Sequence, residues 1–255
     1  MGKAVHCLPL MGAMKPRSLL LVLAAASLSG CSAESKSAEA ATTARADSSG
    51  GLVIAPSTPY KPNSAEVSTA LVVNLVGDSG TPAPTPACQD EDPQPGTVFW
   101  VDGIREGKPL PNERRYSLVD GACGIQPHVQ ATVVGGAINV FNDVGLHKLI
   151  FVRAGTTDTL QTMPFTNEGS VVATERLTRT AGVVEVRCTM HPNERAYIAV
   201  FDHPYFGVAS TGDKITLDSV PAGDYRLMTW HEGMPAPVAV PAKVGATGST
   251  EIILR

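Results

Sequence analysis

Cys188 and His191 are the two residues whose types and spacing point most directly to chemistry. They stand three positions apart, and Cys188 ends an alternating apolar run that contains Val184 and Val186. Such a run is typical of a strand, so a thiolate and an imidazole would be aimed at one point where the strand enters a loop. An imidazole from a distant strand, such as that of His147, would complete the trigonal His₂Cys set that suits copper.

The composition favours a β-rich domain with many turns. The chain has 255 residues with 24 Gly and 20 Pro, and only 17% of its residues are charged. Gly and Pro interrupt regular structure, and stretches of Val, Ile, Leu and Tyr recur between them. The formal net charge is −4, which gives no electrostatic case for a nucleic-acid partner.

Short apolar stretches at regular intervals predict an all-β protein. They predict strands at residues 70–76, 97–101, 129–134, 137–141, 182–188, 196–201, 214–217, 224–230, 238–240 and 251–254. No ten-residue amphipathic helix is predicted. Many short strands separated by turns are typical of a β-sandwich.

The first thirty residues resemble a bacterial lipoprotein signal. A basic start at Met14–Arg17 and an apolar stretch at residues 18–27 lead into Leu28-Ser29-Gly30-Cys31. The resemblance implies that residues 1–30 are removed and that Cys31 is lipidated, which would anchor the chain to a membrane. Ser32 in place of Asp implies the outer membrane, with the protein facing the periplasm or the surface of the cell envelope. The alternative is a short membrane or core helix.

The rest of the chain divides by composition into a tether and a folded part. Residues 31–66 are rich in Ser, Ala and Thr, which predicts a flexible tether. Residues 67–255 are predicted to form the β-sandwich domain, with residues 200–255 as an extension. A second Pro-rich stretch, residues 80–95, interrupts the domain near its start.

The five cysteines have different expected fates. Cys7 would leave with the signal and Cys31 would carry the lipid, so the folded part lies in an oxidising compartment. Cys88 and Cys123 are then candidate disulfide partners, which leaves Cys188 as the unpaired thiol. Two alternatives stay open: Cys188 pairs with Cys123 or Cys88, or Cys188 is a small buried hydrophobe.

The pattern Asn142-Asp143-x-x-x-His147, followed by Cys188-x-x-His191-Pro192, resembles the cupredoxins, the plastocyanin-like blue-copper proteins. It is most similar to bacterial exported plastocyanin-like proteins with methylamine-utilisation names. The resemblance implies a cupredoxin-like Greek-key β-sandwich with additional C-terminal strands. It also implies one bound copper, with one-electron transfer to a redox partner protein or copper storage.

A second resemblance covers the C-terminal stretch. His203-Pro204-Tyr205-Phe206, Val220-Pro221-Ala222-Gly223-Asp224-Tyr225 and Trp230-His231-Glu232 are similar to carboxypeptidase regulatory-like modules, which are small β-sandwiches. The implied role is structural, and His203 and His231 are interpreted as structural or rim residues. His128 has no partner that its spacing suggests.

Residue by residue, the cupredoxin resemblance makes His147, Cys188 and His191 the copper ligands. The family commonly continues as His-Pro-x-Met, whereas Glu194 stands at the methionine position here. Glu194 as the axial ligand would be harder than a thioether, would favour Cu(II) and would lower the redox potential. Met163 or Met190 could substitute for the missing thioether.

The Glu194 replacement also supports a second hypothesis. A metal-free β-sandwich lipoprotein with an interaction or structural role in the envelope would keep the fold and lose the copper. In that case Cys188 would be inert or disulfide-bonded. No Ser/His/Asp order, paired carboxylates or phosphate-binding loop indicates an enzyme.

Overall fold

The computed structural model describes residues 59–63, 69–76 and 96–254, which lie in the compact unit Thr43–Arg255. These residues form strands, turns and one short 3-10 turn, η2 (Arg176–Thr178), so the all-β prediction is confirmed. The described part of the chain contains no helix that is long and apolar enough to cross a membrane. The predicted signal at residues 1–30, Cys31 and Cys88 lie outside the described residues.

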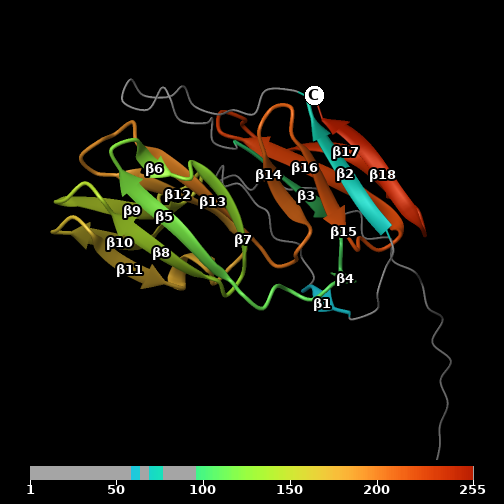
Figure 1. Ribbon diagram of the computed structural model, residues 1–255, viewed down its shortest axis with the longest axis horizontal. Coiled ribbons are helices and arrows are strands. Elements are labelled where there is room, and N and C mark those ends of the chain that lie inside the picture. Colours follow the sequence, from blue (N-terminus) through green and yellow to red (C-terminus); the bar gives the residue numbers. More distant parts are fainter. Residues whose placement is uncertain (1–58, 64–68, 77–95, 255) are drawn as a thin grey trace, which may run out of the picture. The chain divides into compact units, whose positions relative to one another are not determined.

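Two sheets that share one core carry the candidate site (Figure 1). The five-stranded sheet has the order β10 (Thr159–Phe165), β9 (His147–Arg153), β12 (Gly182–Cys188), β13 (Arg195–Phe201) and β7 (Val129–Val133). The four-stranded sheet has the order β11 (Ser170–Thr174), β8 (Ala137–Asn142), β5 (Arg115–Gly121) and β6 (Gly124–Gln126). Leu118 and Ile138 of the second sheet share a buried cluster with Leu149 and Phe151 of the first, so the two sheets form a sandwich.

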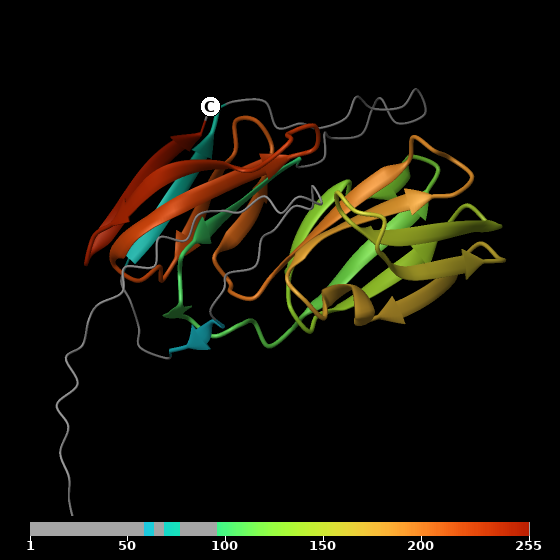
Figure 2. The same cartoon turned by 180° about the vertical axis from the view of Figure 1, so that it is seen from behind.

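The remaining strands form a second pair of sheets. One has the order β14 (Phe206–Ala209), β3 (Thr97–Asp102), β16 (Gly223–His231) and β17 (Val238–Val244), and the other has β15 (Lys214–Asp218), β2 (Thr69–Leu75) and β18 (Gly248–Leu254). Leu71, Phe99, Leu227 and Ile252 belong to one core cluster that both sheets line. Figure 2 shows the cyan strand β2 among the orange and red C-terminal strands. β2 and β3 therefore pair with the C-terminal strands and not with those that carry the candidate site.

A short ladder lies within the stretch that is predicted as the tether. β1 (Lys61–Pro62) pairs in parallel with β4 (Glu106–Gly107), although residues 31–66 are predicted to be flexible. The Tyr60 side chain packs against the cluster of Leu71 and Phe99, and its hydroxyl donates to the Lys108 carbonyl at 2.6 Å. This aromatic contact and the ladder hold residues 60–62 against the folded part, and the boundary at residue 66 stays a prediction.

A third buried cluster contains two tryptophans that the sequence leaves without a role. Trp100 of β3 and Trp230 of β16 lie in it with Tyr197 and Phe201 of β13. The rings of Tyr197 and Trp230 meet edge to face, with centroids 5.4 Å apart. Aromatic pairs of this geometry contribute about 1 kcal/mol beyond their burial. This aromatic cluster therefore covers the outer face of β13 and keeps water from that part of the site-bearing sheet.

His203 is a structural histidine and makes stability depend on pH. Its ring is buried, its Nδ1 accepts from the Tyr205 amide at 3.1 Å, and burial, assisted by Arg105, lowers its pKa to about 4. A histidine pKa below its unfolded value means that stability is complete above that value and is lost as the pH falls toward the folded pKa. We expect the protein to lose about 2 kcal/mol of unfolding free energy between pH 7 and pH 5 from this residue.

Urea unfolding at both pH values measures this loss. The control is His203→Asn, whose side-chain oxygen can still accept from the Tyr205 amide but does not titrate in this range. The variant should show a flatter pH dependence, whatever its absolute stability. If the unfolding free energy changed equally with pH in the two proteins, His203 would be ruled out as the source of the pH dependence.

Candidate functional site

Cys188 lies where β12 ends, with its side chain in the core. The inward positions Val184, Val186 and Cys188 alternate with outward ones, as the sequence predicts, and all three belong to the same buried cluster. Cys188 pairs with Leu149 of β9 in the antiparallel register. Its thiol is free and buried. The strand therefore fixes the sulfur, and the loop that follows must bring any partner to it.

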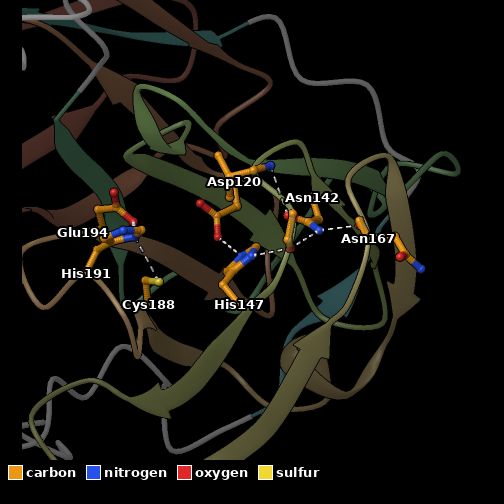
Figure 3. Close-up of polar contacts among 9 residues, drawn as sticks. Asp120, Asn142, His147, Asn167, Cys188, His191 and Glu194 are labelled. Atoms are coloured by element: carbon orange, nitrogen blue, oxygen red, sulfur yellow. Dashed lines mark hydrogen bonds and ion pairs between the residues drawn. The ribbon is translucent and has the colours of Figure 1, made fainter.

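The loop after β12 brings His191 and Glu194 to that sulfur (Figure 3). His191 Nδ1 lies 3.6 Å from Cys188 Sγ and 3.0 Å from Glu194 Oε2. The Glu194 amide donates to the His191 carbonyl at 2.9 Å, and the Cys188 amide donates to the Glu194 carbonyl at 3.3 Å. These backbone bonds close a tight turn. One ligand atom from each of the three residues lies within 4.8 Å of the others, so they could hold a metal ion.

His147 lies at the start of β9 and has partners at both ring nitrogens. Its Nε2 contacts the Asp120 carboxylate, and its Nδ1 lies 3.1 Å from the Gly145 carbonyl oxygen. The ring is buried and stacks on Phe165 with centroids 5.4 Å apart. The group that could hold a metal comprises Cys188, His191 and Glu194, so His147 as a ligand stays a prediction.

Asn142 holds the loop that leads into His147. Its side-chain Nδ2 donates to the Gly145 carbonyl at 2.8 Å and to the Asn167 carbonyl at 2.6 Å, while its Oδ1 accepts from the Val144 amide at 3.3 Å. The residue is fully buried at the end of β8. A buried amide with these bonds fixes the turn and, through Gly145, the orientation of the His147 ring.

Asp120 is the site residue that the sequence analysis misses. It lies on β5, pairs in parallel with Asn142 of β8, and is 1% exposed. Burial raises the pKa of its carboxyl, His147 and His191 act in the opposite sense, and the nearby Glu194 charge raises it further. Asp120 stands two residues after the core residue Leu118 and so shares its inward face, but that face is known only once β5 is placed.

The thiol of Cys188 shares this electrostatic environment. Burial raises its pKa, the backbone amides of Met190 and His191 act in the opposite sense, and the charges of Asp120 and Glu194 raise it further. The thiol is therefore less acidic than a free cysteine. A bound cation would reverse this, because a coordinating thiol loses its proton.

The other predicted residues are not members of this group. Met163 is buried in β10 within the core, and Met190 is 59% exposed in the loop after β12. Cys123 is disulfide-bonded, and Cys188 is free, so the alternative of a bond between them is wrong. The partner of Cys123 is not among the described residues, and its pairing with Cys88 stays a prediction.

Two further histidines lie near the end of β16. His128 Nε2 pairs with Glu232 Oε2 at 2.7 Å, and the Tyr197 hydroxyl donates to Glu232 Oε1 at 3.0 Å. His231 Nδ1 lies 2.7 Å from the Glu232 carbonyl oxygen. The partner of His128 is thus Glu232. The two residues are more than a hundred positions apart, so spacing along the sequence does not suggest this pair.

The donor set is suited to a metal ion. The atoms that converge are a thiol sulfur, an imidazole nitrogen and a carboxylate oxygen. Thiolate and imidazole suit copper and zinc, and a carboxylate adds a harder donor. Asp120 is not one of these three residues, but its buried carboxylate oxygen Oδ1 has no hydrogen-bond partner among the described residues. Such an orphaned acceptor is costly unless a cation or water meets it.

The comparisons with known proteins place cupredoxins among the structural neighbours. The sequence matches no protein-family model and no curated protein sequence. A purple cupredoxin from Nitrosopumilus maritimus is 18% identical, with 33% of this chain and 98% of that chain covered and a TM-score of 0.29. An auracyanin from Roseiflexus castenholzii is 12% identical over 37% and 100% of the two chains, with a TM-score of 0.28. Amicyanin from Paracoccus versutus is 20% identical over 36% and 84%, with a TM-score of 0.27. Similarities of this size do not assign a function.

Proposed function

We propose that the chain is a copper-binding protein of the cell envelope that transfers single electrons to a partner protein or holds copper. One observation carries the proposal. The buried free thiol of Cys188 contacts the His191 ring at 3.6 Å, and Glu194 completes a group of three possible ligand atoms within 4.8 Å of one another. His147 is proposed as the third strong ligand.

The protein's own residues would provide the rigidity that a redox centre needs. Copper, when bound, supplies one-electron redox chemistry. The register of β9 and β12 holds Cys188 beside Leu149, and the packed core around them excludes water from the sulfur. The His191 side chain is 54% exposed, which makes it the ligand that a redox partner would approach.

The location in the envelope is also a proposal. Residues 1–30 would direct export, lipid on Cys31 would anchor the chain, and the outer membrane is the proposed destination. The disulfide at Cys123 supports an oxidising compartment, because such bonds persist there and are rare in the cytosol.

A metal-free β-sandwich with an interaction or structural role is the second candidate. It is favoured by His147, whose ring nitrogens both lie against protein oxygens, those of the Asp120 carboxylate and the Gly145 carbonyl. This candidate predicts that copper and chelators leave the stability of the protein unchanged.

Thermal unfolding of the full chain with and without copper separates the two candidates. A ligand that binds only the native state raises the unfolding free energy by about 2.7 kcal/mol at a hundred times its dissociation constant. We expect Cu(II) to raise the melting temperature and dialysis to give one copper per chain. Cys188→Ser should lose both effects, while Asn193→Ala, at an exposed position in the same loop, should keep them. A wild-type melting curve that copper does not move would favour the metal-free candidate.

A further inference from the structure

Asp120 carries a buried charge that the structure only half satisfies. The side chain is 1% exposed, and Oδ2 contacts His147 Nε2. The other oxygen, Oδ1, is buried and receives no hydrogen bond from the described residues. An isolated buried carboxylate is expensive and is normally neutralised by a proton, a paired cation or a metal. Asp120 therefore has one oxygen available to a further positive group.

The available carboxylate faces the same space as the candidate metal ligands. In Figure 3 the Asp120 carboxylate points between His147 and the group formed by Cys188, His191 and Glu194. The charges of Glu194 and His191 both act on Asp120, and the charge of Asp120 acts on Cys188. These side chains come from β5, from the end of β12 and from the loop that follows it. The sandwich thus brings two carboxylates and one thiol together around one region.

We propose that Asp120 is a metal ligand through Oδ1 and that the resulting site selects a divalent cation. The proposal rests on the metal site of the proposed function and specifies which ions that site takes. When ionised, Asp120, Cys188 and Glu194 contribute three negative charges. A divalent ion leaves one of these charges uncompensated, and a monovalent ion leaves two. The electrostatic free energies of the two occupied sites differ strongly where the dielectric constant is low.

Ligand chemistry points the same way. Carboxylate oxygens are hard donors that suit divalent ions such as Zn(II) and Cu(II), whereas Cu(I) prefers soft thiolate and thioether donors. The second carboxylate oxygen would stay with His147 Nε2 and orient the ring, as carboxylates beside metal-binding histidines commonly do, so His147 would bind the metal through Nδ1 in exchange for its contact with the Gly145 carbonyl. Asp120 would therefore act on the metal directly and on His147 through a hydrogen bond.

Competition with chelators of known affinity tests the proposal on the full chain. Zn(II) and, under anaerobic conditions, Cu(I) are titrated into the wild type, Asp120→Asn and Asp143→Asn. We expect Asp120→Asn to weaken Zn(II) binding by at least about tenfold and to change Cu(I) binding by less than about threefold. Asp143→Asn removes an exposed carboxylate from the adjacent loop and should leave both affinities unchanged.

Other outcomes overturn the assignment. A parallel loss of Zn(II) and Cu(I) affinity would mean that Asp120 only positions His147, and Zn(II) affinity within twofold of wild type would mean that it has no role at the metal. Failure of the proposed copper function would be separate: the wild type would then bind no copper, whether or not it binds Zn(II) through Asp120. A wild type that binds neither metal would overturn both.

An infrared measurement on the wild type keeps the test valid if Asp120→Asn does not fold. Protein labelled with ¹³C at the aspartate side-chain carboxyl is compared with and without Zn(II). We expect Zn(II) to shift a carboxylate stretching band that carries the aspartate isotope shift. Absence of any aspartate band in the difference spectrum would refute direct ligation.

Discussion

His147→Leu is expected to destabilise the metal-free protein by about 3–5 kcal/mol at neutral pH, the typical cost of leaving one member of a buried ion pair without its partner. Both side chains of the pair are almost completely buried, at 2% for His147 and 1% for Asp120. Without the imidazole, Asp120 must either keep an uncompensated charge or take up a proton. Either response costs free energy at neutral pH.

The double variant Asp120→Asn/His147→Leu is the matched control. It removes the charge together with its partner, so it should be more stable than His147→Leu alone. Burial already raises the pKa of Asp120 in the wild type. An acid whose folded pKa is raised favours folding most below its unfolded pKa and loses this contribution as the pH rises through the folded value. The difference in unfolding free energy between the single and the double variant should therefore become smaller as the pH falls from 7.5 to 5.

Urea unfolding in the presence of a chelator measures this gap. Linear extrapolation gives the unfolding free energy for each protein at each pH. If the single variant were as stable as the double variant at pH 7.5, the contact between Asp120 and His147 would not be a charge pair. If the gap were independent of pH, the cost would come from packing and not from ionisation.

Phe151→Ala is expected to cost about 3–5 kcal/mol, in the range measured for large-to-small changes at buried aromatic positions. Phe151 is fully buried in β9, pairs with Val186 of β12, and lies in the cluster that contains Cys188. The cavity would lie beside the two strands that hold His147 and Cys188. Loss of stability should therefore be accompanied by weaker metal binding.

Val171→Ala provides the comparison for this change. Val171 is on β11 of the same sandwich but is 52% exposed, so its truncation should change the unfolding free energy by less than about 0.5 kcal/mol. Denaturant unfolding of both variants measures the difference. Equal and small effects would mean that the cluster around Phe151 is not the core that supports the site.

The strands that the sequence predicts correctly are those with strong apolar alternation. β12 and β13 fall where Val184-x-Val186-x-Cys188 and the run at residues 196–201 indicate. β5, β10 and β11 were not predicted. Five of the seven side chains of β10 are exposed or half-buried, and the strand contains Pro164, which weakens the pattern of a strand. Polar, half-exposed strands show little alternation of apolar and polar residues in the sequence. They become recognisable as strands only through their pairing with apolar neighbouring strands in the structure.

The division of strands between the two sandwiches could not be predicted either. β2 and β3 precede the site-bearing strands in sequence but pair with β15, β18, β14 and β16. Such pairings join residues more than a hundred positions apart. Neither the local strand propensity nor the spacing of apolar residues indicates which strands pair, because the pairing depends on contacts between distant segments in the folded chain.

The candidate site was predictable where its residues are local in sequence. Cys188, His191 and Glu194 lie within seven positions, and the structure brings them together. Asp120 was not found, because a single inward carboxylate in a half-polar strand looks like any surface aspartate. Its role becomes visible only when β5 is placed beside β8 and the His147 ring.

The visible absorption spectrum of the full chain loaded with Cu(II) tests the central claim most directly. Charge transfer from the Cys188 thiolate to copper should give an intense visible band in the wild type. Cys188→Ser should abolish that band, because serine offers no thiolate. A wild-type protein that stays colourless and retains no copper after dialysis would contradict the copper site.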